Sequence, residues 1–365
     1  MSVTLNERLE LIHRQIQQSC ESLGRVAVAL YDEKTDLLHT FLYSSCNNPL
    51  KNYQIALSNV PSLQTLALSG EQRVIRDLPE TLAGSTSHHS QQILQEGYRS
   101  SLTIPLKLQD KLLGFLFYDS YEPDIFGDTL LSTLTLYAQL ISETISHDLA
   151  SIKTLRGAVV TAREFSRLRD EETAAHLSRM AHYARLIAIE VSEVYDLTEE
   201  EIEYIHQFAP LHDLGKVAIP DNILLKSGAL SVDEKVIMRS HVIRGVEIVD
   251  LMIDEFDLGT IRHIDILRNI IAGHHERFDG SGYPAGVHGT TIPVESRIVA
   301  VADVLDALTT KRPYKEPWPF VDALKHMRTA EAHLYDPLCL QAIATRLDEM
   351  EQISRRFVED PVEVA

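Results

Sequence analysis

Histidines and carboxylates gather in short motifs in the second half of this 365-residue chain, and they are the residues most able to do chemistry. His212 and Asp213 open the segment HDLGK in an apolar setting, and His274 and His275 follow an apolar run. Asp303 stands alone inside an apolar helical pattern. A buried carboxylate is costly unless it is paired or bound to a metal, and imidazole suits borderline divalent metals. These motifs therefore predict a metal site.

The complete set of candidate ligands is larger than one ion needs. Glu172 and His176 are four residues apart, so on a helix both project from one face, although such a pair alone is more often a surface hydrogen-bonded pair. Asp306 is interpreted as serving its own helix. Two or three divalent ions of Fe, Mn, Zn or a similar metal would suit the set. The predicted ligands are Glu172, His176, His212, Asp213, His241, His274, His275 and Asp303.

A glycine-flanked tyrosine and several cations provide a substrate side for this site. Gly280 and Gly282 flank a tight loop in which glycine tolerates backbone angles that other residues avoid, and the loop presents Tyr283 to a ligand. Arginine suits bidentate phosphate contact, whereas lysine acts as a point charge. An ordinary glycine turn and solvated cations are the alternative interpretation. The cations predicted to contact phosphate are Lys216, Arg312 and Lys315.

Two or three neighbouring metal ions suit the hydrolysis of a phosphodiester, with a metal-bridging hydroxide as the nucleophile instead of a side chain. The formal net charge of −19 argues against binding to duplex nucleic acid, which is held mainly by cationic contacts to many phosphates. A small phosphorylated substrate remains compatible, because a few cations and bound metals reverse the field inside one site.

Three cysteines without metal or disulfide spacing, a charged N-terminal segment and the lack of a long apolar run predict a cytoplasmic protein that does not enter a membrane. Residues 1–127 show alternating strand patterns at 25–31, 38–43, 101–108 and 112–118, which predict an antiparallel sheet with flanking helices. Residues 128–160 carry a near-heptad apolar stripe, which predicts a connector helix that dimerises the chain; a helix packed on its own domain is the alternative.

Residues 161–365 have an almost entirely helical pattern. We expect an all-α domain here, and every candidate ligand falls on or at the end of one of its helices. The predicted helices cover residues 172–194, 198–206, 232–252, 261–272, 293–309, 320–331 and 337–354.

Residues 160–350 resemble the HD-GYP domain family, a branch of the HD metal-dependent phosphohydrolases that hydrolyses the bacterial second messenger cyclic di-GMP. The resemblance rests on HDLGK, His241, HHERFDGSGYP, IPVESRIVAVADVLDALTTKRPYK and YDP. It implies that the core ligands are His212, Asp213, His241, His274, His275 and Asp303, and that Lys216, Tyr283, Arg312 and Lys315 contact the dinucleotide.

Family members with a glutamate one turn before the first histidine hold a third metal, and Glu172 with His176 matches that subgroup. The resemblance thus implies a trinuclear site, with iron as the expected metal and manganese as an alternative. It also implies that the linear intermediate pGpG is carried on to GMP. Asp213 and Lys216 are the residues expected to act in catalysis.

Residues 20–147 are similar to a GAF sensory domain, through the strand pattern and the segments SLTIPL and GFLFYD. The expected fold is therefore an α+β GAF-like domain followed by an all-α HD-superfamily domain. The expected function is a cyclic di-GMP phosphodiesterase regulated by a GAF domain of unknown ligand, with diguanylate cyclase domains as further candidate partners. The alternatives are a cyclic di-GMP receptor with little turnover, and a phosphohydrolase of another dinucleotide such as cyclic GMP-AMP.

Overall fold

The computed structural model describes residues 4–85, 87–108, 111–165, 173–255, 263–311 and 316–358. The chain forms two compact units, Met1–Ala150 and Ser151–Ala365. Helix α5, Asp128–Phe165, contains the boundary between the two units, within the stretch where a connector helix is predicted. None of the helices in these described ranges is long and apolar enough to cross a membrane.

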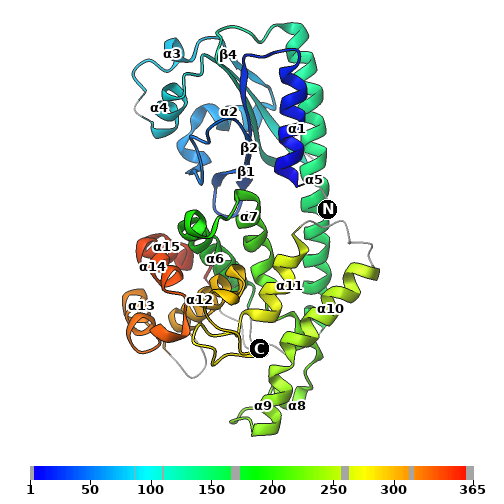
Figure 1. Cartoon of the computed structure of the whole chain (residues 1–365), viewed down its shortest axis with the longest axis vertical. Helices are drawn as coiled ribbons and strands as arrows, with labels where there is room; N and C mark the ends of the chain where they lie inside the picture. Colours follow the sequence, from blue (N-terminus) through cyan, green and yellow to red (C-terminus); the bar gives the residue numbers. More distant parts are fainter. Residues whose placement is uncertain are drawn as a thin grey trace, which may run out of the picture. The chain divides into compact units, whose positions relative to one another are not determined.

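The described part of the first unit folds six strands into one antiparallel sheet with the order β3-β2-β1-β6-β5-β4 (Figure 1). The predicted hairpins are confirmed as β1–β2 and β5–β6, and β1 pairs with β6 at the centre. Two three-residue edge strands, β3 and β4, were not predicted. The strands are β1 Leu23–Asp32, β2 Leu37–Ser44, β3 Gln54–Ala56, β4 Arg73–Ile75, β5 Ser100–Leu108 and β6 Lys111–Ser120.

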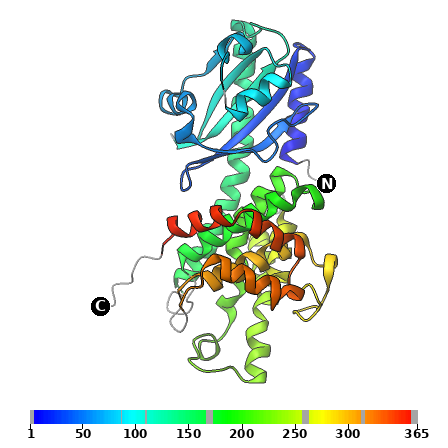
Figure 2. The same cartoon turned by 90° about the vertical axis from the view of Figure 1, so that its left-hand side faces the viewer.

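Helices cover both faces of this sheet. Helix α1, Leu5–Gln17, and the first part of α5 lie against one face, and α2, α3 and α4 lie on the other side (Figures 1 and 2). Helix α1 begins with a capping box, in which Thr4 and Glu7 satisfy each other's backbone N–H groups. The second set consists of α2 Pro61–Ser69, α3 Leu78–Thr81 and α4 His88–Gln95.

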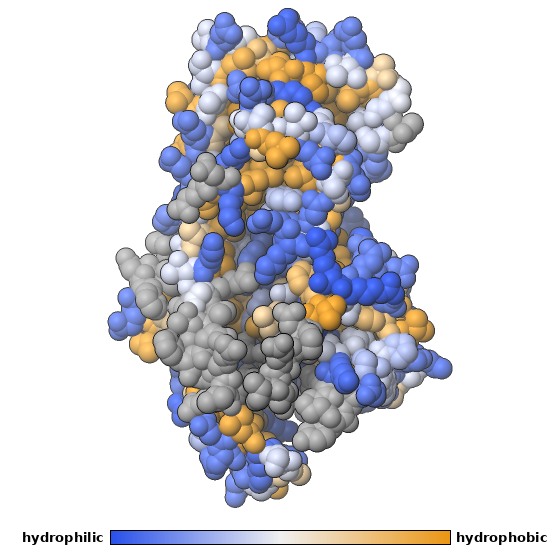
Figure 3. All heavy atoms as spheres, turned by 180° about the vertical axis from the view of Figure 1, so that it is seen from behind, coloured by the Kyte–Doolittle hydropathy of each residue, from blue (hydrophilic) through white to orange (hydrophobic). Residues whose placement is uncertain are grey.

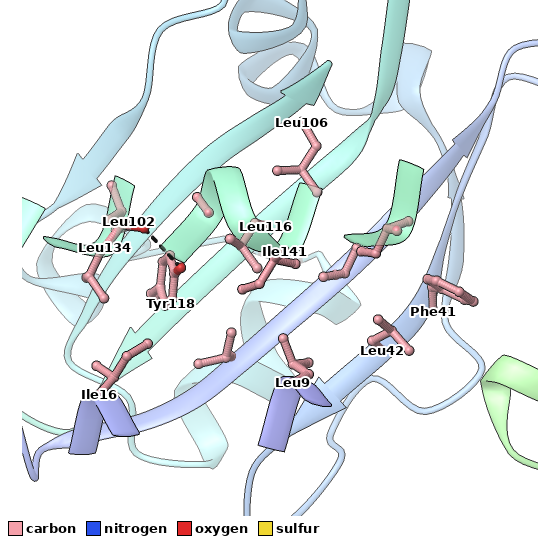
Figure 4. Packing of buried hydrophobic residues seen from close by; sticks show 14 of the residues in the cluster. Leu9, Ile16, Phe41, Leu42, Leu102, Leu106, Leu116, Tyr118, Leu134 and Ile141 are labelled. Atoms are coloured by element: carbon pink, nitrogen blue, oxygen red, sulfur yellow. Dashed lines mark hydrogen bonds between the residues drawn. The ribbon is translucent and has the colours of Figure 1, made fainter. Parts of the chain in front are cut away.

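The main core of the first unit lies between the sheet and the helices α1 and α5 (Figure 4). Leu9 and Ile16 of α1 meet Leu116 of β6 and Ile141 of α5, and all four are buried. The Tyr118 hydroxyl donates a hydrogen bond to the Leu134 carbonyl oxygen at 3.2 Å. Burial of these side chains, each worth roughly 1.5–3 kcal/mol, holds the start of α5 on the sheet.

The described part of the second unit is helical, as predicted, and α6 contacts α7, α12, α14 and α15. Two predicted helices are wrong in one respect, because each is interrupted: the helix at 232–252 is divided at Ser240 and the helix at 337–354 at Arg346. The helices are α6 Ala174–Tyr195, α7 Glu199–Phe208, α8 Asp221–Leu224, α9 Val232–Arg239, α10 His241–Glu255, α11 Ile264–Gly273, α12 Val294–Thr309, α13 Phe320–Thr329, α14 Pro337–Thr345 and α15 Leu347–Arg356.

Candidate metal centre

Four of the predicted ligands form one group. Asp213, His241, His274 and His275 each offer an atom that lies within 4.8 Å of the ligand atoms of the other three. The Asp213 Oδ1 atom is 3.1 Å from His241 Nε2 and 3.6 Å from His274 Nε2. Asp213, His241 and His274 are buried and His275 is half-buried. Residues up to 62 positions apart (275 − 213) thus meet at one point.

The ends of helical segments carry these side chains. His212 and Asp213 lie between two short 3-10 helices, η2 Ala209–Leu211 and η3 Leu214–Ala218. His241 is the first residue of α10, and His274 is the C-cap of α11. Gly215 permits the close packing of η3 on α10, because a Cβ there would collide with the His241 carbonyl oxygen. The glycine of the HDLGK segment is therefore required for packing.

Backbone carbonyl oxygens orient the imidazoles. Nδ1 of His212 lies 3.0 Å from the Ala209 oxygen, and Nδ1 of His241 lies 2.8 Å from the Met238 oxygen. Nδ1 of His274 makes the same kind of contact with two carbonyl oxygens at the end of α11. An imidazole that donates from Nδ1 presents Nε2 as its metal-binding atom, as ligating histidines commonly do.

The hydrogen bonding of Asp213, His241 and His274 fits a bound metal ion. Within the described part of the chain, Asp213 Oδ1, His241 Nε2 and His274 Nε2 are buried atoms that make no hydrogen bond of accepted geometry. Buried polar atoms are almost always satisfied, and each exception requires an explanation. Three unsatisfied electron-pair donors that point at one another are explained by a shared cation.

Charges around Asp213 keep it ionised. Burial favours its protonated form, but the Lys216 ammonium and the His212 imidazole outweigh burial and hold the pKa of Asp213 well below its usual value. Lys216 Nζ lies 2.8 Å from Asp213 Oδ2. Burial lowers the pKa of both His274 and His275, which favours their neutral, metal-binding form. The group is thus ready to accept a cation.

A second group lies beside the first and comprises His176, His212 and Asp303, whose ligand atoms also lie within 4.8 Å of one another. His176 Nε2 is 3.9 Å from Asp303 Oδ1. The two groups adjoin, because His212 Nε2 is 3.1 Å from Asp213 Oδ2. Seven of the eight predicted ligands therefore lie in two adjacent groups, and the eighth, Glu172, lies outside the described residues.

Asp306 lies beside this centre. It accepts a hydrogen bond from the Thr310 hydroxyl at the end of its own helix, in line with its interpretation, but it also contacts residues of another helix. It contacts His176, and Arg179 of α6 donates to both of its carboxylate oxygens, at 2.6 and 2.9 Å. A carboxylate inside an apolar helix was the signal that identified Asp303, and the same signal applies to Asp306. Arg179 was also not predicted.

Tyr283, predicted to face a substrate, lies beside the candidate metal ligands. Its ring stacks on His275, with centroids 4.7 Å apart and planes 26° apart. Burial, reinforced by the Asp213 charge, raises the pKa of Tyr283 to about 12, so its hydroxyl stays a hydrogen-bond donor at neutral pH. Gly280 has the expected positive φ of 82°, whereas Gly282 is needed because a Cβ would collide with the neighbouring backbone.

The loop that carries Tyr283 is held by a residue that the sequence interpretation missed. The buried Glu276 accepts hydrogen bonds from the Ala285 and Gly286 N–H groups at 2.7 and 3.1 Å. Its signal was the charge that directly follows the two histidines. Arg312 and Lys315, two of the predicted phosphate contacts, lie outside the described residues.

Two family matches agree with this architecture. Residues 169–338 match the HD domain family, and residues 4–145 match the GAF domain family. The α+β unit followed by a helical unit, which the sequence predicts, is thereby confirmed. The chain is similar over 189 residues, at 45% identity, to the cyclic di-GMP phosphodiesterase response regulator RpfG of Xanthomonas campestris, and this match covers 52% of the chain and 47% of the relative.

Two further relatives differ in the substrates that they are named for. A 3'3'-cGAMP-specific phosphodiesterase 2 of Vibrio cholerae is 30% identical over 338 residues, which are 91% of this chain and 62% of the relative. A cyclic di-GMP phosphodiesterase of Thermotoga maritima is 37% identical over 191 residues, 52% of this chain and 49% of the relative. The chain thus spans 47% to 62% of the length of these three relatives.

Proposed function

Because residues 169–338 belong to the HD domain family and residues 4–145 to the GAF domain family, we propose that the chain is a metal-dependent phosphodiesterase of cyclic di-GMP. It opens the cyclic dinucleotide to pGpG and carries this product on to GMP, under the control of its GAF domain. The observation that carries the proposal is the convergence of Asp213 Oδ1, His241 Nε2 and His274 Nε2, three buried atoms that face one another.

Two adjacent groups of ligands support a site for at least two divalent ions, with iron as the expected metal and manganese as the alternative. Asp213, His241, His274 and His275 would hold one ion, and His176, His212 and Asp303 would hold another. When bound, such ions activate a water molecule and balance the charge of a reacting phosphate. Neutral imidazoles and an ionised Asp213 are the protonation states that this role needs.

The chain's own residues bind and orient the substrate. Lys216 places a positive charge at Asp213, where it can meet a phosphate oxygen. Tyr283 keeps its hydroxyl proton at neutral pH and can donate a hydrogen bond to another oxygen of the same phosphate. Glu276 fixes the backbone after Tyr283 and so preserves the direction of that donor. Arg312 and Lys315 would add charge on the substrate side.

Glu172 would add a ligand beside His176 and so create a third metal position next to the second group. The variant Glu172→Ala should lower the metal content from about three to about two ions per chain and slow pGpG hydrolysis more than ring opening. The matched control is Glu193→Ala, which removes an exposed glutamate from α6, the helix that carries His176. This control should keep the metal content of the wild type. An unchanged metal content in Glu172→Ala would remove this third position.

Cyclic GMP-AMP is a second candidate substrate. The Vibrio cholerae relative that is named for this dinucleotide aligns with 91% of the chain, whereas the matches to the other two relatives cover 52% each. The two groups of candidate metal ligands would serve hydrolysis of a phosphodiester, and both dinucleotides contain this bond. Comparison of kcat/KM for the two substrates under the same conditions separates the two candidates.

Self-association through α1 and α5 would bring two copies of the chain together. A groove of about 280 Å³ lies between these helices in the first unit, with Leu5, Leu9 and Ile141 in its lining. Leu11 of α1 and Leu140 of α5 are 53% and 50% exposed, and apolar side chains are visible on the surface of this unit (Figure 3). Light scattering should give the mass of a dimer, and Leu140→Glu should shift it toward a monomer.

The decisive experiment is anaerobic turnover of cyclic di-GMP by protein reconstituted with iron. Products are separated by chromatography, and metal content is measured on the same sample. GMP formation in the wild type, lost in Asp213→Asn and retained in the exposed control Asp233→Asn, is the expected result. A fully metallated wild type that binds cyclic di-GMP without hydrolysing it would instead identify a receptor.

A further inference from the structure

Arg239 lies beside the metal centre, although no motif identified it. Its guanidinium carbon is 4.7 Å from the centre of the Tyr283 ring, the ring that stacks on His275. His241 meets both of these rings at steep angles, with its centroid 5.0 Å from His275 and 6.4 Å from Tyr283. One cation is therefore placed against the aromatic side chain that faces the candidate metal ligands.

The interruption at Ser240 accompanies this placement. Successive residues of a helix are rotated by about 100°, so residues two apart point about 160° away from each other. Arg239 and His241 could therefore not both face one site from a continuous helix. Here α9 ends at Arg239 and α10 begins at His241, and both side chains reach the pair of rings formed by His275 and Tyr283. The break thus adds a cation to the site without moving the ligand.

The charge of Arg239 is not used elsewhere in the described structure. Among the described residues no carboxylate forms an ion pair with it, whereas Lys216 pairs with Asp213 and Arg244 pairs with Glu247 at 2.9 Å. Arg239 is also exposed. Contact with an aromatic face holds a guanidinium in position and leaves its in-plane N–H donors available for an anion.

We propose that Arg239 is a substrate-binding residue that holds the phosphate of the cyclic dinucleotide that is not being cleaved. The inference rests on the proposed function. A cyclic dinucleotide has two phosphodiesters on opposite sides of its ring, so while one lies at the metal ligands the other needs a cation of its own. Arginine suits this task because it donates two parallel hydrogen bonds to one phosphate.

Steady-state kinetics with cyclic di-GMP test the assignment in the variants Arg239→Ala and Arg239→Lys. The alanine variant should raise KM about tenfold and leave kcat within about twofold, because it removes one charge-assisted contact to a group that does not react. The lysine variant keeps the charge but loses the planar set of N–H donors, so its KM should lie between those of the wild type and the alanine variant. Arg244→Ala, which removes an exposed and already paired arginine on the next helix, should match the wild type.

Equilibrium binding gives a readout that does not depend on turnover. Calorimetric titration with the phosphorothioate analogue of cyclic di-GMP, which resists hydrolysis, should show about tenfold weaker binding to Arg239→Ala than to the wild type. The difference should shrink as salt rises, because exposed charge contacts are screened. A merely structural role for Arg239 would not produce this salt dependence.

The outcomes separate this inference from the proposed function. An active wild type with unchanged KM and binding in Arg239→Ala overturns the role of Arg239 alone. A variant that loses kcat at unchanged KM overturns it too, because Arg239 would then only position Tyr283. A metallated wild type that neither hydrolyses nor binds either cyclic dinucleotide overturns both the function and the inference.

Discussion

The Asp306 carboxylate accepts a hydrogen bond from Nδ1 of His176 at 2.7 Å, and this bond directs Nε2 of His176 toward Asp303. Burial would favour the protonated form of Asp306, but His176 and Arg179 outweigh it and lower the pKa of this carboxyl group. A candidate metal ligand is thus oriented by a buried ion pair that does not itself reach the metal position. Such outer contacts fix the orientation of ligating histidines.

Asp306→Asn should weaken both the fold and the metal site. The substitution removes the negative charge of Asp306 that pairs with the buried Arg179, and breaking a buried ion pair costs about 3 kcal/mol of the free energy of unfolding. It also loosens His176, so metal content should fall. Urea unfolding and elemental analysis of the purified variant measure the two effects. The exposed Asp322→Asn serves as control, and wild-type values for both quantities in Asp306→Asn would contradict the assignment.

Glu276→Ala should release the loop that carries Tyr283. The variant removes two charge-assisted hydrogen bonds to backbone N–H groups, each worth about 1.5–3 kcal/mol. Hydrogen exchange over residues 279–286, followed by mass spectrometry, should become at least about tenfold faster, and KM for the dinucleotide should rise. Glu276→Gln retains one acceptor oxygen and should exchange more slowly than the alanine variant. Equal exchange rates in the wild type and Glu276→Ala would contradict this role.

His13 should make the stability of the first unit sensitive to acid. Its ring contacts the Ser44 hydroxyl and the Leu23 carbonyl oxygen at 2.8 and 3.0 Å, and burial lowers its pKa from 6.5. Below about pH 6.5 the imidazole binds a proton in the unfolded chain but resists it in the folded chain. The free energy of unfolding therefore decreases as the pH decreases, by at most about 1.4 kcal/mol per pH unit from this group.

Urea unfolding at pH 7.5, 6.5 and 5.5 measures this dependence in the full chain. His13→Gln should flatten the acid limb, because the group that binds the proton is gone. The exposed His88→Gln is the control and should keep the wild-type slope. The same slope in His13→Gln and the wild type would show that other groups cause the dependence.

Removal of metal should destabilise the second unit. A ligand that binds only the folded state at a hundred times its Kd adds about 2.7 kcal/mol to the free energy of unfolding. Treatment with a chelator should therefore lower Tm by about 5–10 °C, and added iron or manganese should restore it. Asp213→Asn, which loses the central carboxylate, should show a smaller response. A Tm that is insensitive to the chelator would contradict a metal site at Asp213.

The sequence predicted the carboxylates Asp213 and Asp303, missed the same signal at the buried Asp306, and failed where backbone geometry decides. Asp213 and Asp303 stood out because carboxylates rarely lie in apolar segments. The break at Ser240 gave no such signal, because the apolar spacing of α9 continues into α10. Glu276 acts through backbone N–H groups nine and ten residues later, and Arg239 acts from the surface, so neither leaves a pattern that can be read along the chain.

The ligands of the two metal groups belong to separate helical segments, and contacts between these segments, including the ion pair of Arg179 and Asp306, must bring them together when no ion is bound. His176 lies in the first turn of α6, His241 starts α10, His274 is the C-cap of α11 and Asp303 lies within α12. Bound ions would cross-link these segments as a disulfide cross-links loops. In a cell starved of metal, this unit would open more often and meet proteases more often. The amount of the protein in the cell would then fall when metal is scarce.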